Sequence, residues 1–154
     1  TYAIMRINKL TDYGIVIMTK IASMDAESIH TAKEMSEITN IPLPTVTRLL
    51  KTLAAEGLLT SQRGSQGGYT LAHPPSTISI ASIIESFEGP IALIECATND
   101  CECSYEADCS TQEPWQKINE SVKAALEEIK LNDMIETKPN NGFVKLNMNL
   151  GAEV

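Results

Sequence analysis

Apolar residues recur at intervals of three or four in the first part of the chain, which is the spacing of one helix face. Between about Lys9 and Met24 this spacing holds for Leu10, Tyr13, Ile17, Ile21 and Met24. A second, shorter helix is expected to begin at Thr31, because Thr31 and Glu34 have the spacing of a capping box. The pattern therefore predicts two amphipathic helices before residue 40.

A third helix is predicted from about Pro44 to Glu56, and Gly57 is placed to end it. Its apolar face consists of Val46, Leu49, Leu50 and Leu53. Two short strands are expected next, at residues 58–61 and 68–71, with a glycine-rich turn between them. Helix, helix, turn, helix and hairpin is the order of a winged helix-turn-helix. We therefore expect a mainly α fold with a small β wing, and a DNA-binding domain over residues 5–75.

The second half of the chain divides into four segments where the pattern changes. These are a connecting helix within 76–94, a cysteine-rich loop at 95–113, a long helix from 114 to about 131 within a segment 114–135, and a tail at 136–154. In the long helix a narrow apolar stripe resembles a coiled-coil seam: Trp115, Ile118, Val122, Leu126 and Ile129. Near the end of the tail apolar and polar residues alternate, which predicts a strand.

The distribution of charge along the chain says more about possible partners than the net charge does. The 154 residues carry a formal net charge of −8, which by itself argues against a nucleic-acid partner. Residues 1–75, however, hold seven basic and six acidic residues, whereas 76–154 hold five basic and fourteen acidic residues. Any contact with DNA is therefore expected in the N-terminal half. No apolar run is long enough to cross a bilayer, so no membrane partner is expected.

All four cysteines lie close together, with the spacing C-x4-C-x-C-x5-C: Cys96, Cys101, Cys103 and Cys109. No signal peptide is visible, so we expect a cytoplasmic location in which clustered cysteines more often serve a metal or redox site than disulfides. Structural zinc is less favoured because the paired C-x2-C spacing is absent. The spacing alone leaves iron–sulfur, zinc and thiol chemistry open.

The third helix and the hairpin carry the residue types that read DNA. Threonine hydroxyls can bond bases or phosphates, arginine can bond guanine through two hydrogen bonds, and a thin glycine-containing turn can approach the sugar–phosphate backbone. The candidates are Thr45, Thr47, Arg48, Lys51, Ser61, Arg63 and Gly64. Alternatively, Arg48 and Lys51 form a solvated helix face and the glycines an ordinary hairpin. The combined order of these features favours DNA.

The stretch from Ser61 to Leu71, of the form S-x-R-G-x-x-G-G-Y-x-L, resembles the IscR-type family of bacterial transcription regulators, the Rrf-two family. The run Thr11-Asp12-Tyr13-Gly14 is a second match, and the similarity continues to about residue 135. The resemblance implies a homodimer with two winged helices and a crossing dimerisation helix at 114–135. It also implies binding to operator DNA and, in many members, an iron–sulfur cluster. The four-cysteine segment is most similar to the branch that regulates the SUF cluster-assembly operon.

The resemblance further implies how an iron–sulfur cluster, [2Fe-2S] or [4Fe-4S], would be held. Family members commonly use three cysteines, and their pattern matches best at Cys96, Cys103 and Cys109. Cys101 is then an additional thiol that serves as the fourth ligand or replaces Cys103. In other members the fourth ligand is an acidic residue of the partner's first helix, and Asp12 stands at that position. The helix dipole alone also explains an acid there, so both interpretations of Asp12 stay open.

The sequence therefore predicts a homodimeric transcriptional repressor that binds double-stranded operator DNA and senses iron–sulfur or redox status through a labile cluster. In its most specific form, the prediction is a repressor that controls the genes for cluster assembly. One alternative is a zinc-bound or thiol-switch repressor without a cluster, and another is an iron–sulfur carrier that does not bind DNA. An enzyme is not expected, and neither is a small-molecule substrate, because the sequence has no nucleotide-binding loop and no Cys/His nucleophile pair.

Overall fold

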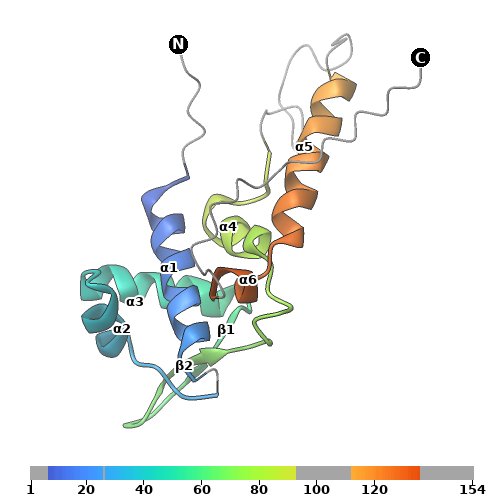
Figure 1. The fold of residues 1–154 in the computed structure, drawn as a ribbon. Coiled ribbons are helices and arrows are strands. Elements are labelled where there is room, and N and C mark those ends of the chain that lie inside the picture. Colours follow the sequence, from blue (N-terminus) through green and yellow to red (C-terminus); the bar gives the residue numbers. More distant parts are fainter. Residues whose placement is uncertain (1–6, 26, 93–111, 136–154) are drawn as a thin grey trace.

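The computed structural model describes residues 7–25, 27–92 and 112–135. In chain order the elements are α1 (Lys9–Ser23), α2 (Ala32–Thr39), α3 (Leu43–Ala55), β1 (Leu59–Gln62), β2 (Gly68–Leu71), α4 (Ile80–Glu88), α5 (Gln112–Glu128) and α6 (Leu131–Ile135). Figure 1 shows α1 to α4, the hairpin and α6 gathered into one body, from which α5 projects. The predicted class, mainly α with a small antiparallel sheet, is confirmed.

Local hydrogen bonds explain where the helices begin. The capping box predicted for α2 is confirmed: Thr31 Oγ1 accepts from the Glu34 amide at 3.1 Å, and Glu34 Oε2 accepts from the Thr31 amide at 3.4 Å. Ser79 caps α4 by accepting from the Ser82 amide at 3.1 Å. A cap of this kind typically contributes about 1 kcal/mol. The start of α3 differs, because Pro42 occupies the cap position and makes no side-chain hydrogen bond there.

One hydrophobic core joins the helices and the base of the hairpin. Its fully buried apolar side chains are Ile17, Met18, Ile21, Met35, Val46, Leu49, Leu50, Leu53, Ile83 and Leu131. All four apolar positions predicted for α3 are among them. Burial of one such side chain contributes about 1.5–3 kcal/mol, so this core is the main source of stability for the winged helix.

The buried arc of α1 is wider than the sequence pattern predicts. Leu10, Tyr13 and Met24 are only half-buried, whereas Met18 is fully buried although it lies outside the predicted stripe. The physical reason is that α1 contacts α3 as well as α4 and α6, so that more than one of its faces is covered.

The two strands pair in antiparallel fashion, with Leu59 opposite Leu71, and both lie within one residue of their predicted bounds. A further bridge attaches β2 to the loop before α2. In it the His30 amide donates to the Tyr69 carbonyl at 2.9 Å, and the Tyr69 amide donates to the His30 carbonyl at 2.8 Å. The wing is therefore anchored at its base to the segment that leads into the helix-turn-helix.

The prediction of one helix from 114 to about 131 is wrong at its C-terminal end. α5 ends at Glu128, and the following residues pair with the segment before α4. There the Ile129 carbonyl accepts from the Ile80 amide at 2.9 Å, and the Leu131 amide donates to the Ile78 carbonyl at 2.8 Å. These bonds bring Leu131 into the core at the start of α6, which packs against α1. The strand predicted in the tail lies outside the described residues.

Candidate nucleic-acid interface

The turn between α2 and α3 sets the position of the helix proposed to read DNA. Asn40 ends α2 in the left-handed conformation, with φ 58°, which asparagine tolerates better than most residues. Ser36 Oγ donates to the Ile41 carbonyl at 2.7 Å, and the Ile41 side chain is buried. The turn is therefore fixed by a hydrogen bond and by the core, and it holds α3 firmly against α2.

The exposed face of α3 carries two of its predicted contact residues. Arg48 and Lys51 are exposed, whereas Thr45 and Thr47 are partly buried at its sides. Thr47 Oγ1 donates to the Leu43 carbonyl at 2.9 Å. Its single hydroxyl proton is therefore committed within the helix, and in this arrangement Thr47 can accept a hydrogen bond from a base but not donate one.

The wing presents its turn fully to solvent. Residues 61–66 are all exposed, and they include the predicted contacts Ser61, Arg63 and Gly64. Gly64 has φ 120°, a conformation that favours glycine. At Gly68 an added Cβ would lie 2.6 Å from the His30 carbonyl oxygen. These two glycines are therefore required by the hairpin itself, and the case for DNA contact rests on the polar and basic side chains around them.

Among the residues that the structure describes, no acid forms an ion pair with the basic side chains of this surface. In the described part of the chain, the two ion pairs are His30 with Glu34 at 3.4 Å and Lys123 with Glu85 at 3.3 Å. Arg48, Lys51 and Arg63 belong to neither of them. Their charges are therefore available to an anionic partner such as DNA phosphate.

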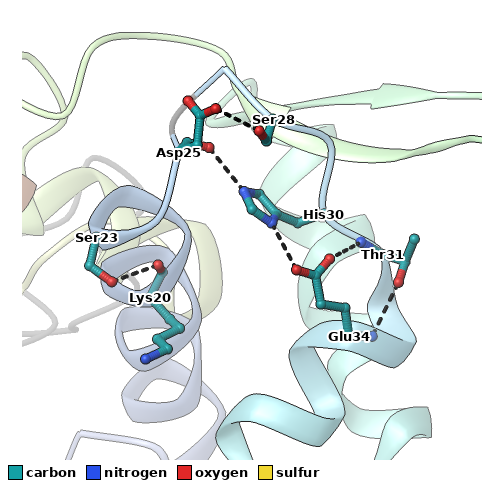
Figure 2. A network of polar contacts seen from close by, with 7 residues as sticks. All are labelled: Lys20, Ser23, Asp25, Ser28, His30, Thr31 and Glu34. Carbon is teal, nitrogen blue, oxygen red and sulfur yellow. Dashed lines mark hydrogen bonds and ion pairs between the residues drawn. The ribbon is translucent and has the colours of Figure 1, made fainter.

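A polar network links the loop after α1 to the start of α2, and Figure 2 shows it. His30 is only 3% exposed, with Nε2 lying 3.1 Å from the Asp25 carbonyl oxygen and Nδ1 lying 3.4 Å from Glu34 Oε1. Ser28 Oγ donates to Asp25 Oδ2 at 2.7 Å, and this hydrogen bond is the main reason that the pKa of Asp25 is lowered.

The sequence reasoning missed this structural role of His30. The available signal was its place directly before the capping residue Thr31 and four residues before Glu34. The contact with the wing could not be seen, because His30 and Tyr69 are far apart in the sequence.

Of the proposed cluster ligands, four lie outside the residues that the structure describes and one lies within them. Cys96, Cys101, Cys103 and Cys109 lie outside the described residues. Asp12 is exposed in the first turn of α1. Within residues 7–25, 27–92 and 112–135, no three His, Cys, Asp or Glu side chains are grouped to hold a metal ion. The ligand set therefore stays a prediction.

Comparison with known proteins identifies the family. The family model Rrf2, described as an iron-dependent transcriptional regulator, matches residues 7–137. The chain belongs to the Rrf2 family. It is accordingly a helix-turn-helix transcriptional regulator and not an enzyme, and the resemblance found in the sequence is confirmed.

Relatives of the chain match it over most of their length. A helix-turn-helix transcriptional regulator of Neisseria meningitidis is 31% identical over 138 residues, which is 90% of this chain and 92% of that protein. The solved structure of Bacillus subtilis CymR, the global cysteine regulator, is 28% identical, with a TM-score of 0.69, and covers 86% of this chain and 97% of its own. The IscR structure of T. potens is 27% identical, with a TM-score of 0.64, and the match covers 85% of this chain and 86% of that protein.

These structures confirm the winged-helix architecture for this Rrf2 protein. No helix in the described ranges is long and apolar enough to span a membrane. Control of cluster-assembly genes stays a prediction.

Proposed function

We propose that this Rrf2 protein is a cytoplasmic, homodimeric repressor that binds double-stranded operator DNA through α3 and the wing. The observation that carries the proposal is the exposure of Arg48, Lys51 and Arg63 without acidic partners among the described residues. A helix-turn-helix protein places its recognition helix in the major groove, where arginine can bond guanine and lysine can neutralise phosphate. In this arrangement Arg48 reads base edges, while Lys51 and Arg63 contact the backbone.

Alanine at Lys51 or Arg63 tests the backbone contacts. Each variant should weaken binding to all duplexes to a similar degree and reduce the slope of log affinity against log salt by about 2, because the proposed homodimer loses one phosphate contact in each subunit. Fluorescence anisotropy over a salt series measures both quantities. Lys117→Ala is the matched control, since Lys117 is an exposed basic residue on α5. If both variants keep the wild-type slope, α3 and the wing are not the DNA-binding surface.

The dimer is proposed on the properties of α5. Trp115 and Ile118 are 41% and 46% exposed, which is unusual for large apolar side chains placed three residues apart on one helix. A second copy of α5 would cover them in a coiled-coil-like contact. The exposed apolar stripe is what supports a homodimer of this kind.

For sensing, we propose that Cys96, Cys103 and Cys109 hold an iron–sulfur cluster, with Cys101 or Asp12 as the further ligand. When bound, such a cluster supplies a redox-sensitive group that oxidants can remove. The cysteine segment leads directly into α5, and α6 at the other end of α5 is built into the winged-helix core through Leu131. This continuity supports a route from the cysteines to the DNA-binding surface, and through it to control of cluster-assembly genes.

A thiol-switch repressor without a cluster is the second candidate. It is favoured by similarity to CymR, a cysteine regulator, and to Staphylococcus aureus CymR, whose oxidised form has been solved and is 26% identical with a TM-score of 0.65. In that case the four thiols would act through oxidation rather than through iron. Iron and sulfide analysis separates the two candidates.

A further inference from the structure

We propose that Leu43 reads the 5-methyl group of a thymine in each operator half-site. This inference deepens the proposed function and rests on it. Leu43 is the first residue of α3 and its side chain is 44% exposed, although leucine is normally buried. The N-terminal residues of a recognition helix are the ones that meet base edges in the major groove.

The start of α3 has fewer hydrogen-bonding groups than most helix starts. Pro42 and Pro44 have no amide proton, and Pro42 makes no side-chain cap. The hydroxyl proton of Thr47, one turn further along, is committed to the Leu43 carbonyl at 2.9 Å. The first turn also carries no acidic residue that phosphates would repel. Beside the Thr45 hydroxyl, this end of the helix therefore presents the exposed apolar side chain of Leu43.

Thymine is the base that offers an apolar group in the major groove. Its C5-methyl projects there, whereas guanine, cytosine and adenine present hydrogen-bond donors and acceptors. Arg48 and Lys51, which pair with no acid among the described residues, lie on the same helix and favour DNA as its partner. In this arrangement the aliphatic side chain of Leu43 contacts the methyl group, and the basic side chains further along α3 make the polar contacts.

The test uses duplexes selected from a random pool by the full-length protein, purified without oxygen. Each thymine of the selected site is replaced in turn by deoxyuridine, which keeps every hydrogen-bonding group and removes only the methyl. In each half-site one replacement should weaken wild-type binding by about fourfold, the effect expected for losing one buried methyl group.

The same replacement should have no effect on Leu43→Ala, because the partner of the methyl is already absent. Val16→Ala is the control: Val16 is a similarly exposed apolar residue, 41% exposed, on α1, and this variant should keep the fourfold penalty. Circular dichroism confirms that both variants are folded. Equal binding of thymine and uracil at every position, or a penalty that persists in Leu43→Ala, would overturn the inference while leaving DNA binding intact. If no duplex is selected at all, the proposed function itself fails.

Discussion

In the loop after α1, the ionisation of Asp25 is controlled by its nearest neighbours. Ser28 Oγ donates to Oδ2 at 2.7 Å and the Glu27 amide donates to Oδ1 at 3.1 Å. Both hydrogen bonds favour the charged carboxylate, so they lower the pKa of Asp25 below its ordinary value. A lowered pKa in the folded state contributes stability above the pKa of the unfolded chain. That contribution is lost as the pH falls through the folded-state pKa.

Ser28→Ala should therefore raise the pKa of Asp25 toward its ordinary value, because the largest cause of the shift is removed. Carboxyl carbon chemical shifts followed through an acid titration measure this directly. Ser23→Ala is the control, since the Ser23 hydroxyl donates to the Lys20 carbonyl at 2.8 Å and not to Asp25. An unchanged Asp25 pKa in Ser28→Ala would show that the loop of Figure 2 does not persist in solution.

At the residue scale, the sequence predicts those roles that depend on near neighbours. The capping box of Thr31 and Glu34 is an example, because both partners lie within one turn. The hydrogen bond from the Thr47 hydroxyl to the Leu43 carbonyl also joins near neighbours. A threonine in a helix can form this bond or turn its hydroxyl elsewhere, so the sequence alone does not predict it. The main-chain pairing of His30 with Tyr69 could not be predicted, because the two residues are far apart in the sequence.

At the scale of elements, the wing depends on a close approach of two backbones. Gly68 lies at the start of β2, where the His30 carbonyl comes so near that an added Cβ would be 2.6 Å away. Backbone atoms cannot move aside as a flexible side chain can. The pairing of His30 with Tyr69 therefore requires a residue without a side chain at this position.

Gly68→Ala should accordingly lower the free energy of unfolding by about 1–3 kcal/mol, the usual cost of forcing extra volume into a packed contact. Urea denaturation followed by circular dichroism gives the value. Ser65→Ala, in the exposed turn of the same hairpin, should stay within about 0.5 kcal/mol of the wild type. If Gly68→Ala is as stable as Ser65→Ala, the wing is not attached to the α2 loop as described.

The helices of the DNA-binding part could be predicted well because their periodicity and caps agree. The division of the last helix into α5 and α6 could not, because Leu126 and Ile129 continue the helical spacing without a break. The helix ends there because residues 129–131 form main-chain hydrogen bonds with residues 78–80, which are distant in the sequence. Such long-range pairing overrides the local preference for helix.

At the scale of the whole molecule, α5 and the winged helix are joined more closely than the sequence suggests. Leu131 is fully buried in the same core as α1 and α3. In addition, Lys123 Nζ lies 3.3 Å from Glu85 Oε1, so α5 also contacts α4. Figure 1 shows α5 extending from the end of the body opposite the hairpin. A change at one end of α5 can therefore be transmitted to the body through packed elements.

The class of fold could thus be predicted from the sequence. Arg48, Lys51 and Arg63 are exposed as a DNA contact requires, and their contact with DNA stays a prediction. Cys96 to Cys109 could be recognised as a group from their spacing. The ligands of the proposed cluster could not, because a fourth ligand would depend on which residue approaches the cysteines in space.

The central claim is that the cysteine segment controls DNA binding by α3 and the wing through bound iron. The most direct test is the affinity for a selected duplex of protein purified without oxygen, measured before and after its iron is removed anaerobically with a chelator. Iron and acid-labile sulfide are determined on the same samples. The account predicts iron and sulfide in matching amounts and an affinity that changes by about tenfold or more, equal to about 1.4 kcal/mol. Protein that contains no iron and sulfide, or whose affinity is the same after their removal, would contradict it.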